Sequence, residues 1–155
     1  MSNNAKILLS EVVEQRRKAI APAYSESEFF ELFVAEQLLK EYDLSYDEIE
    51  AGITDAGGDG GIDSAYLFLN GDLVQGEQGR IRCRKEPEIQ FILLQSKTED
   101  GFSETAIEKL RHSAEDLFDL EKDLNSLSSV YNKELLSAFA QFRELYQTHT
   151  SNFPR

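Results

Sequence analysis

Apolar and polar residues follow a helical period in four segments of the chain. In each segment apolar side chains recur every three or four residues, and polar or proline-containing stretches separate the segments. The second segment opens with Ser25 and has Glu28 three residues later, which is the pattern of a capping box. The periodicity predicts helices over residues 3–20, 25–42, 103–120 and 129–147.

Three shorter segments are typical of strands, at residues 49–54, 62–69 and 89–96. The last of them, IQFILLQS, is the most strand-like and is apolar enough for a central place in a sheet. Asn70-Gly71 predicts a hairpin turn, and we expect residues 72–88 to form a hairpin arm or an excursion. The pattern therefore predicts a mixed α/β domain with a small sheet.

Composition narrows the class of protein. The chain has 155 residues, of which 41% are hydrophobic and 29% charged, as in a globular domain. We find no apolar run of the roughly 18 residues that a membrane span needs, and the start lacks the pattern of a secretory signal. The single cysteine, Cys83, excludes an intramolecular disulfide framework. We expect a cytoplasmic protein without membrane contact.

The net charge limits the kinds of partner. Sixteen basic against 29 acidic residues give −13, whereas a protein that grips nucleic acid unaided is usually basic. This charge argues against strong non-specific binding, but it is compatible with a site where metal cations offset phosphate charge. Sequestration of a basic partner is an alternative that the charge leaves open.

The densest chemical signal combines a glycine- and aspartate-rich loop, residues 55–63, with Gln95-Ser96-Lys97. Asp63 enters a predicted strand, and Gln95 and Lys97 are two apart, so in a strand they share a face. If the two strands are neighbours, a carboxylate, an amide oxygen and an ammonium meet. Oxygen ligands suit Mg²⁺ or Mn²⁺, and the ammonium can stabilise charge on a phosphoryl group. The alternative is a simple turn followed by a solvated strand end.

A carboxylate on the predicted helix 25–42 would complete such a site. A helical wheel places Glu31 on an apolar stripe, where an unpaired carboxylate is costly. The stripe consists of Leu32, Ala35, Leu38, Leu39 and Tyr42. Glu36 has Lys40 four residues later and suits a solvated ion pair, and Glu28 is explained by the capping box. Glu31 is the first candidate, with Glu28 and Glu36 left open.

These motifs resemble a known enzyme superfamily. Phe30-Glu31, then DGGID at 59–63, then Gln95-Ser96-Lys97 are similar to the PD-(D/E)xK nucleases, in the Mrr-like variant with Gln before x-Lys. The pattern resembles still more closely the N-terminal domain of the AIPR (abortive infection phage resistance) family, over about Phe29 to Leu110. The resemblance implies a restriction-endonuclease-like core with a small central mixed sheet flanked by helices. It also implies a Mg²⁺-dependent endonuclease that hydrolyses DNA in phage defence.

The resemblance assigns roles to individual residues. Asp63 would be the central metal ligand and Gln95 the second, through its amide oxygen. Lys97 would be the catalytic lysine, and Glu31 the helix carboxylate near the metal. Asp59 is a further candidate ligand in the loop.

The resemblance also bears on domain organisation. We expect one nuclease-like domain over residues 1–155, with a motif-bearing core at 24–120 and a C-terminal helical extension at 121–155. The family core closes with another strand after the helix that follows x-Lys, whereas two helices follow here. We therefore expect a fragment that lacks its closing strand, and the C-terminal remainder of the same protein as a partner.

Two further surfaces concern partners. If residues 80–84 are extended, Arg80, Arg82 and Arg84 share a face and could contact DNA phosphates, although a charged edge strand explains them as well. The apolar side of the last helix is a candidate for homo-oligomer formation; it comprises Leu135, Leu136, Phe139, Phe142 and Leu145. The alternative function is an inactive nuclease-like module that serves protein assembly or regulation.

Overall fold

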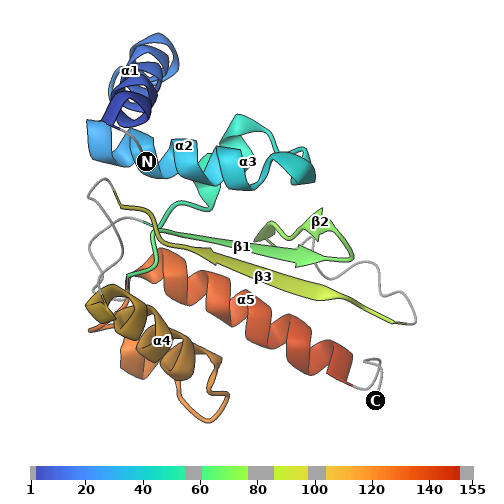
Figure 1. Cartoon of the computed structure of the whole chain (residues 1–155). Helices are drawn as coiled ribbons and strands as arrows, with labels where there is room; N and C mark the ends of the chain where they lie inside the picture. Colours follow the sequence, from blue (N-terminus) through green and yellow to red (C-terminus); the bar gives the residue numbers. More distant parts are fainter. Residues whose placement is uncertain (1–2, 55–60, 77–85, 98–103, 151–155) are drawn as a thin grey trace. The chain divides into compact units, whose positions relative to one another are not determined.

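The computed structural model describes residues 3–54, 61–76, 86–97 and 104–150. The chain divides into two compact units. The first comprises Met1–Ile53 and Ser96–Asp100, and the second comprises Thr54–Gln95 and Gly101–Arg155. The mixed α/β class predicted from the sequence is confirmed, because the described residues form five α-helices and three strands (Figure 1).

The first unit is helical. It contains α1 (Asn3–Ile20), α2 (Glu26–Leu38), the short 3₁₀ helix η1 (Lys40–Tyr42) and α3 (Tyr46–Ala51). The predicted capping box at the start of α2 is confirmed: the Glu28 amide donates to the Ser25 hydroxyl, and the Ser25 amide donates to the Glu28 carboxylate. Reciprocal bonds of this kind satisfy two of the amides that a helix start leaves unpaired.

The predicted strand at 49–54 is wrong, because residues 46–51 form α3. A second capping box starts this helix, with Ser45 as the cap and Glu48 as its partner. Ile49 is then buried on the inner side of a helix of only six residues. One helical turn holds too few apolar positions to distinguish a helix from a strand by period, so the cap is the more informative signal.

The second unit contains an antiparallel sheet in the order β2 (Asp72–Leu73), β1 (Ser64–Leu69), β3 (Ile89–Leu94). The expected mixed sheet is therefore wrong for the described strands, because both pairings are antiparallel. Asn70 and Gly71 form the predicted turn between β1 and β2, both with positive φ (54° and 88°), as a two-residue hairpin of the I′ type requires.

The central strand is β1 and not the predicted segment 89–96. All six residues of β1 are buried, and among the described strands β3 pairs with β1 alone. The run of apolar residues in β3 misled the prediction: most of its side chains are only half-buried, and Gln90 is exposed. Apolar composition shows that a strand is buried on its faces, but its place in the order depends on which edges are paired.

One face of the sheet is covered by α4 (Glu104–Phe118) and α5 (Lys133–His149), with the 3₁₀ helix η3 (Leu124–Leu127) between them (Figure 1). Leu135, Phe139 and Leu145 of α5 are buried against the sheet residues Ala65 and Leu67. The face of the last helix that was a candidate for self-association is therefore largely core in this unit.

Arg143 of α5 fastens the end of α4. Its guanidinium donates to the carbonyl oxygens of Leu117 (2.9 Å), Asp119 (2.7 Å) and Lys122 (2.5 Å). The last carbonyls of a helix have no partner within the helix, so a planar group with five donors can satisfy several at once. This contact holds α4, the helix that borders the candidate site, against α5.

None of the described helices is long and apolar enough to cross a bilayer.

Candidate functional site

Asp63 and Gln95 lie at the same end of the β1–β3 ladder. Asp63 directly precedes β1 and Gln95 directly follows β3, and the last paired residues are Ser64 and Leu94. The amide of Asp63 donates to the carbonyl of Leu94 at 2.8 Å, so the two segments stay hydrogen-bonded just beyond the start of β1. The strands that carry Asp63 and Gln95 are thus neighbours, which is the condition that the predicted site requires.

Gly61 makes room for the side chain of Gln95. Its φ is +66°, and a Cβ atom built on Gly61 would lie 2.9 Å from Nε2 of Gln95 and 3.7 Å from Cβ of Lys109. The first distance is closer than non-bonded atoms tolerate, so a side chain at position 61 would displace the Gln95 amide. This is a specific reason for one glycine in the DGGID motif: it combines a left-handed backbone with close approach of a functional side chain.

Thr54 holds the backbone on which Asp63 is placed. The Thr54 hydroxyl donates to the carbonyl of Ile62 at 2.8 Å, and the Thr54 amide donates to the carbonyl of Asp63 at 2.9 Å. Thr54 is buried, with 3% of its surface exposed. Sequence reasoning missed this role, because a lone threonine carries no signal that it bonds to a segment eight residues away.

Lys97 lies beyond the end of the strand. The prediction extended this strand to Ser96, but β3 ends at Leu94, so the alternation that would place Gln95 and Lys97 on one face does not apply. Lys97 is exposed and belongs with Ser96–Asp100 to the first unit, whereas Gln95 belongs to the second. That Lys97 joins Asp63 and Gln95 in one site stays a prediction.

Glu31 is half-buried on α2 in the first unit, and the stripe on which it was placed is buried only in part. Leu32 and Ala35 of the stripe are buried, and so is Leu39 just after α2. Leu38 is 60% exposed, and the buried Phe29 lies outside the stripe. A helix that is apolar nearly all round has no distinct polar face, so a helical wheel cannot rank its sides. The role of Glu31 as a metal ligand stays a prediction.

The two alternative carboxylates have structural partners. Glu36 forms its ion pair with Arg16 of α1, and not with Lys40 as the spacing suggested. Glu28 serves the capping box, and its hydrogen bonds with the Ser25 hydroxyl and amide hold the pKa of Glu28 below its usual value. These contacts explain both residues without a metal.

Several predicted residues lie outside the described part of the chain: Asp59, Arg80, Arg82 and Arg84. Within the described part, no three or more His, Cys, Asp or Glu side chains gather closely enough to hold a metal. The predicted ligands that the described residues place at the β1–β3 end are one carboxylate, of Asp63, and one amide oxygen, of Gln95. This set is compatible with Mg²⁺, which binds one or two protein carboxylates and keeps waters and substrate phosphates as its other ligands.

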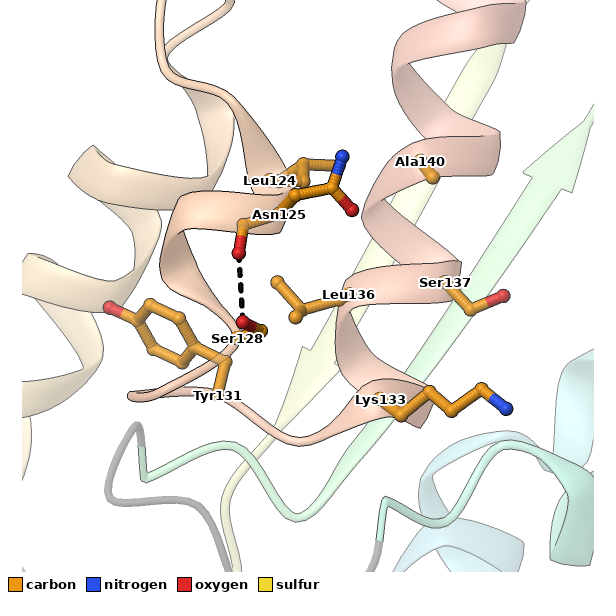
Figure 2. A pocket seen from close by; sticks show the side chains of 8 residues that line it. All are labelled: Leu124, Asn125, Ser128, Tyr131, Lys133, Leu136, Ser137 and Ala140. Carbon is orange, nitrogen blue, oxygen red and sulfur yellow. Dashed lines mark hydrogen bonds between the residues drawn. The ribbon is translucent and has the colours of Figure 1, made fainter.

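A separate cavity of about 350 Å³ lies between η3 and the start of α5 (Figure 2). Leu124, Tyr131 and Leu136 line it, and Ser128 donates to the Asn125 carbonyl at its wall (2.8 Å). The sequence did not indicate this cavity, and none of the predicted site residues lines it.

Comparison with known proteins gives no further guide to the family. No family model, no curated protein and no solved structure matches the chain. The resemblance to PD-(D/E)xK nucleases consequently depends on the order of the three motifs and on the residues that carry them.

Proposed function

We propose that the chain is a metal-dependent endonuclease domain of the PD-(D/E)xK type, which hydrolyses phosphodiester bonds of DNA within a phage-defence protein. The observation that carries this proposal is the placement of Asp63 and Gln95 at one end of two paired antiparallel strands. The two motifs are more than 30 residues apart in sequence, so their common position at the sheet's end depends on the fold.

The chemistry follows from the side chains. The Asp63 carboxylate and the Gln95 amide oxygen would hold Mg²⁺ or Mn²⁺, with Glu31 or Asp59 as a further carboxylate. The bound ion would supply positive charge to the phosphate and lower the pKa of a bound water. Lys97 is exposed, and its ammonium would orient the attacking water or stabilise negative charge on the phosphoryl group.

The neutral amide of Gln95 has a consequence for metal affinity. Gln95 brings no negative charge to balance a divalent cation, so of the two residues at this end of the sheet Asp63 alone would do so. We expect metal affinity to be low without DNA and to rise when substrate phosphates complete the coordination. In a chain of net charge −13 the same cation would offset the repulsion of the DNA backbone.

The proposal is tested with variants of the two residues that would carry the charges, Asp63 and Lys97. The full chain, with any continuation its gene encodes, is incubated with plasmid DNA and Mg²⁺ or Mn²⁺. We expect Asp63→Asn and Lys97→Ala to lower the cleavage rate by about 100-fold or more, as loss of a group that stabilises the transition state usually does.

Two matched variants serve as controls. Asp72→Asn alters an exposed aspartate at the opposite end of β1, and Lys40→Ala removes an exposed lysine of the first unit. Both should cleave like the wild type. Equal rates in the wild type, Asp63→Asn and Lys97→Ala would reject the nuclease assignment. An RNA substrate in parallel shows which nucleic acid is cleaved.

A second candidate function is a nuclease-like module that has lost its chemistry and serves protein assembly or regulation. The neutral Gln95 and the net charge of −13 favour it, because both weaken the site for a metal and for DNA. A folded wild-type protein that cleaves neither DNA nor RNA with either metal would favour this candidate over the first.

A further inference from the structure

Lys109 of α4 borders the end of the sheet that carries Asp63 and Gln95. Its Cβ lies 3.7 Å from the point where a Cβ on Gly61 would stand, and Nε2 of Gln95 lies 2.9 Å from that same point. The three residues come from a loop, the end of β3 and a helix, and all belong to the second unit. No motif in the sequence pointed to Lys109.

The charge of Lys109 is not neutralised within the described part of the chain. It is exposed, and it forms no ion pair or hydrogen bond with any described residue. The residues three and four positions away on α4 are Thr105, Ala106, His112 and Ser113, none of them a carboxylate. Glutamate and lysine at such spacings normally pair on a helix surface, so the absence of an acid on this side leaves the ammonium available.

Neighbouring cations show the contrast. Arg111, two residues further along α4, pairs with Glu115 at 2.6 Å, and Lys122 pairs with Asp116 at 2.5 Å. Among the described residues Lys40, Lys97 and Lys133 also lack an ion pair, so the position of Lys109 at this end of the sheet, and not its free charge alone, sets it apart. The Cβ of Lys109 and the Gln95 amide both lie close to Gly61, and the amide adds no charge of its own.

A free ammonium on a flexible four-carbon stem is suited to binding phosphate as a point charge. We infer that Lys109 binds a backbone phosphate of the nucleic-acid substrate and so positions it at the Asp63–Gln95 end of the sheet. This inference rests on the proposed function, since it assigns a substrate contact to that site. Lys109 would be a positioning residue that does not contact the metal.

The test measures binding apart from cleavage. In an Asp63→Asn background the affinity for a labelled duplex oligonucleotide is measured by fluorescence anisotropy over a range of salt concentrations. We expect Lys109→Ala to weaken binding about 5- to 10-fold and to reduce the slope of log K against log salt by about one, the share of one phosphate contact. Lys109→Arg should restore most of both.

Arg111→Ala is the matched control, because it removes one positive charge from the same helix and its charge is already paired with Glu115. It should change the affinity by less than twofold. Equal losses in the Lys109→Ala and Arg111→Ala variants would overturn the inference, since they would reflect net charge alone. Thermal unfolding of each variant checks that the fold is intact.

The outcomes separate this inference from the proposed function. A wild-type protein that does not cleave DNA, together with Lys109-dependent DNA binding, would retain the contact and reject the nuclease. A wild-type nuclease whose Lys109→Ala variant binds and cleaves normally would reject the contact alone. No DNA binding at all, or Lys109-dependent binding of a labelled nucleoside monophosphate without DNA binding, would also overturn the inference.

Discussion

Replacing Gly61 by alanine tests whether the close contact between Gly61 and Gln95 matters for the site. The added Cβ would lie 2.9 Å from Nε2 of Gln95, and the φ of +66° is unfavourable for any residue with a side chain. The nearest atom is the far end of a flexible side chain. We therefore expect the Gln95 amide to move while the backbone stays in place.

The cost to stability has two parts. A left-handed backbone costs a non-glycine residue about 1–2 kcal/mol, and moving Gln95 from its rotamer adds about 0.5–1.5 kcal/mol. For a chain of this size each kcal/mol lowers the melting temperature by roughly 2–4 °C. The expected loss is therefore small enough for Gly61→Ala to remain folded at room temperature.

Gly76→Ala is the matched control. Gly76 has a φ of +56°, but a Cβ on it would meet no atom within 4 Å. Gly76→Ala should therefore show only the cost of the left-handed backbone.

If Gln95 holds the metal, Gly61→Ala should also need about 10-fold more Mg²⁺ for half-maximal DNA cleavage, because loss of support around a metal ligand commonly lowers metal affinity.

The assay compares melting curves and the Mg²⁺ dependence of plasmid cleavage for the wild type and the two variants. Unchanged Mg²⁺ dependence in Gly61→Ala would refute the role of the Gly61–Gln95 contact. An equal change in Gly76→Ala would show that lower stability, and not displacement of Gln95, is the cause.

Three further predictions concern stability. Arg143→Met removes the donors to the carbonyls of Leu117, Asp119 and Lys122, so urea unfolding should show a loss of about 2–4 kcal/mol. A loss below about 0.5 kcal/mol would contradict this capping role. Burial raises the pKa of Tyr66 to about 12. The neutral Tyr66 side chain therefore contributes fully to stability below the unfolded pKa near 10, and this contribution is lost as pH rises through about 12. Ultraviolet titration should show a tyrosine signal in this range that is absent from Tyr66→Phe. The Lys122 ammonium, together with the Tyr131 hydroxyl, lowers the pKa of Asp116. The contribution of Asp116 to stability is therefore present above the unfolded pKa of about 4 and is lost as pH falls through the lower folded value. Asp116→Asn should make stability less dependent on pH in that acid range, and an unchanged acid dependence would contradict the pairing.

Local signals were reliable where a few neighbouring residues decide the structure. The capping box of Ser25 and Glu28 and the Asn70-Gly71 turn are both as predicted, because their hydrogen bonds and φ angles involve only adjacent residues. The same kind of signal at Ser45 and Glu48 marks α3, which the strand prediction for 49–54 overlooked.

The candidate site was predictable in part. The motifs named Asp63 and Gln95 as candidates on the condition that their strands are neighbours, and β1 and β3 do pair. They did not indicate Thr54, Gly61 as the neighbour of Gln95, or Lys109, because these contacts join segments that are distant in sequence. Nor could they show that Glu36 pairs with Arg16 of another helix.

The sequence by itself determined four of the five described α-helices, the hairpin turn and the mixed α/β class, because periodicity, caps and turn residues act through interactions a few positions apart. Only the tertiary structure decided that β1 is the middle strand of the described sheet and that Lys109 borders the Asp63–Gln95 end. Strand order and the approach of a helix to a loop depend on how whole elements bury their apolar faces against one another. That burial is a property of the packed chain, and no local pattern of residues encodes it.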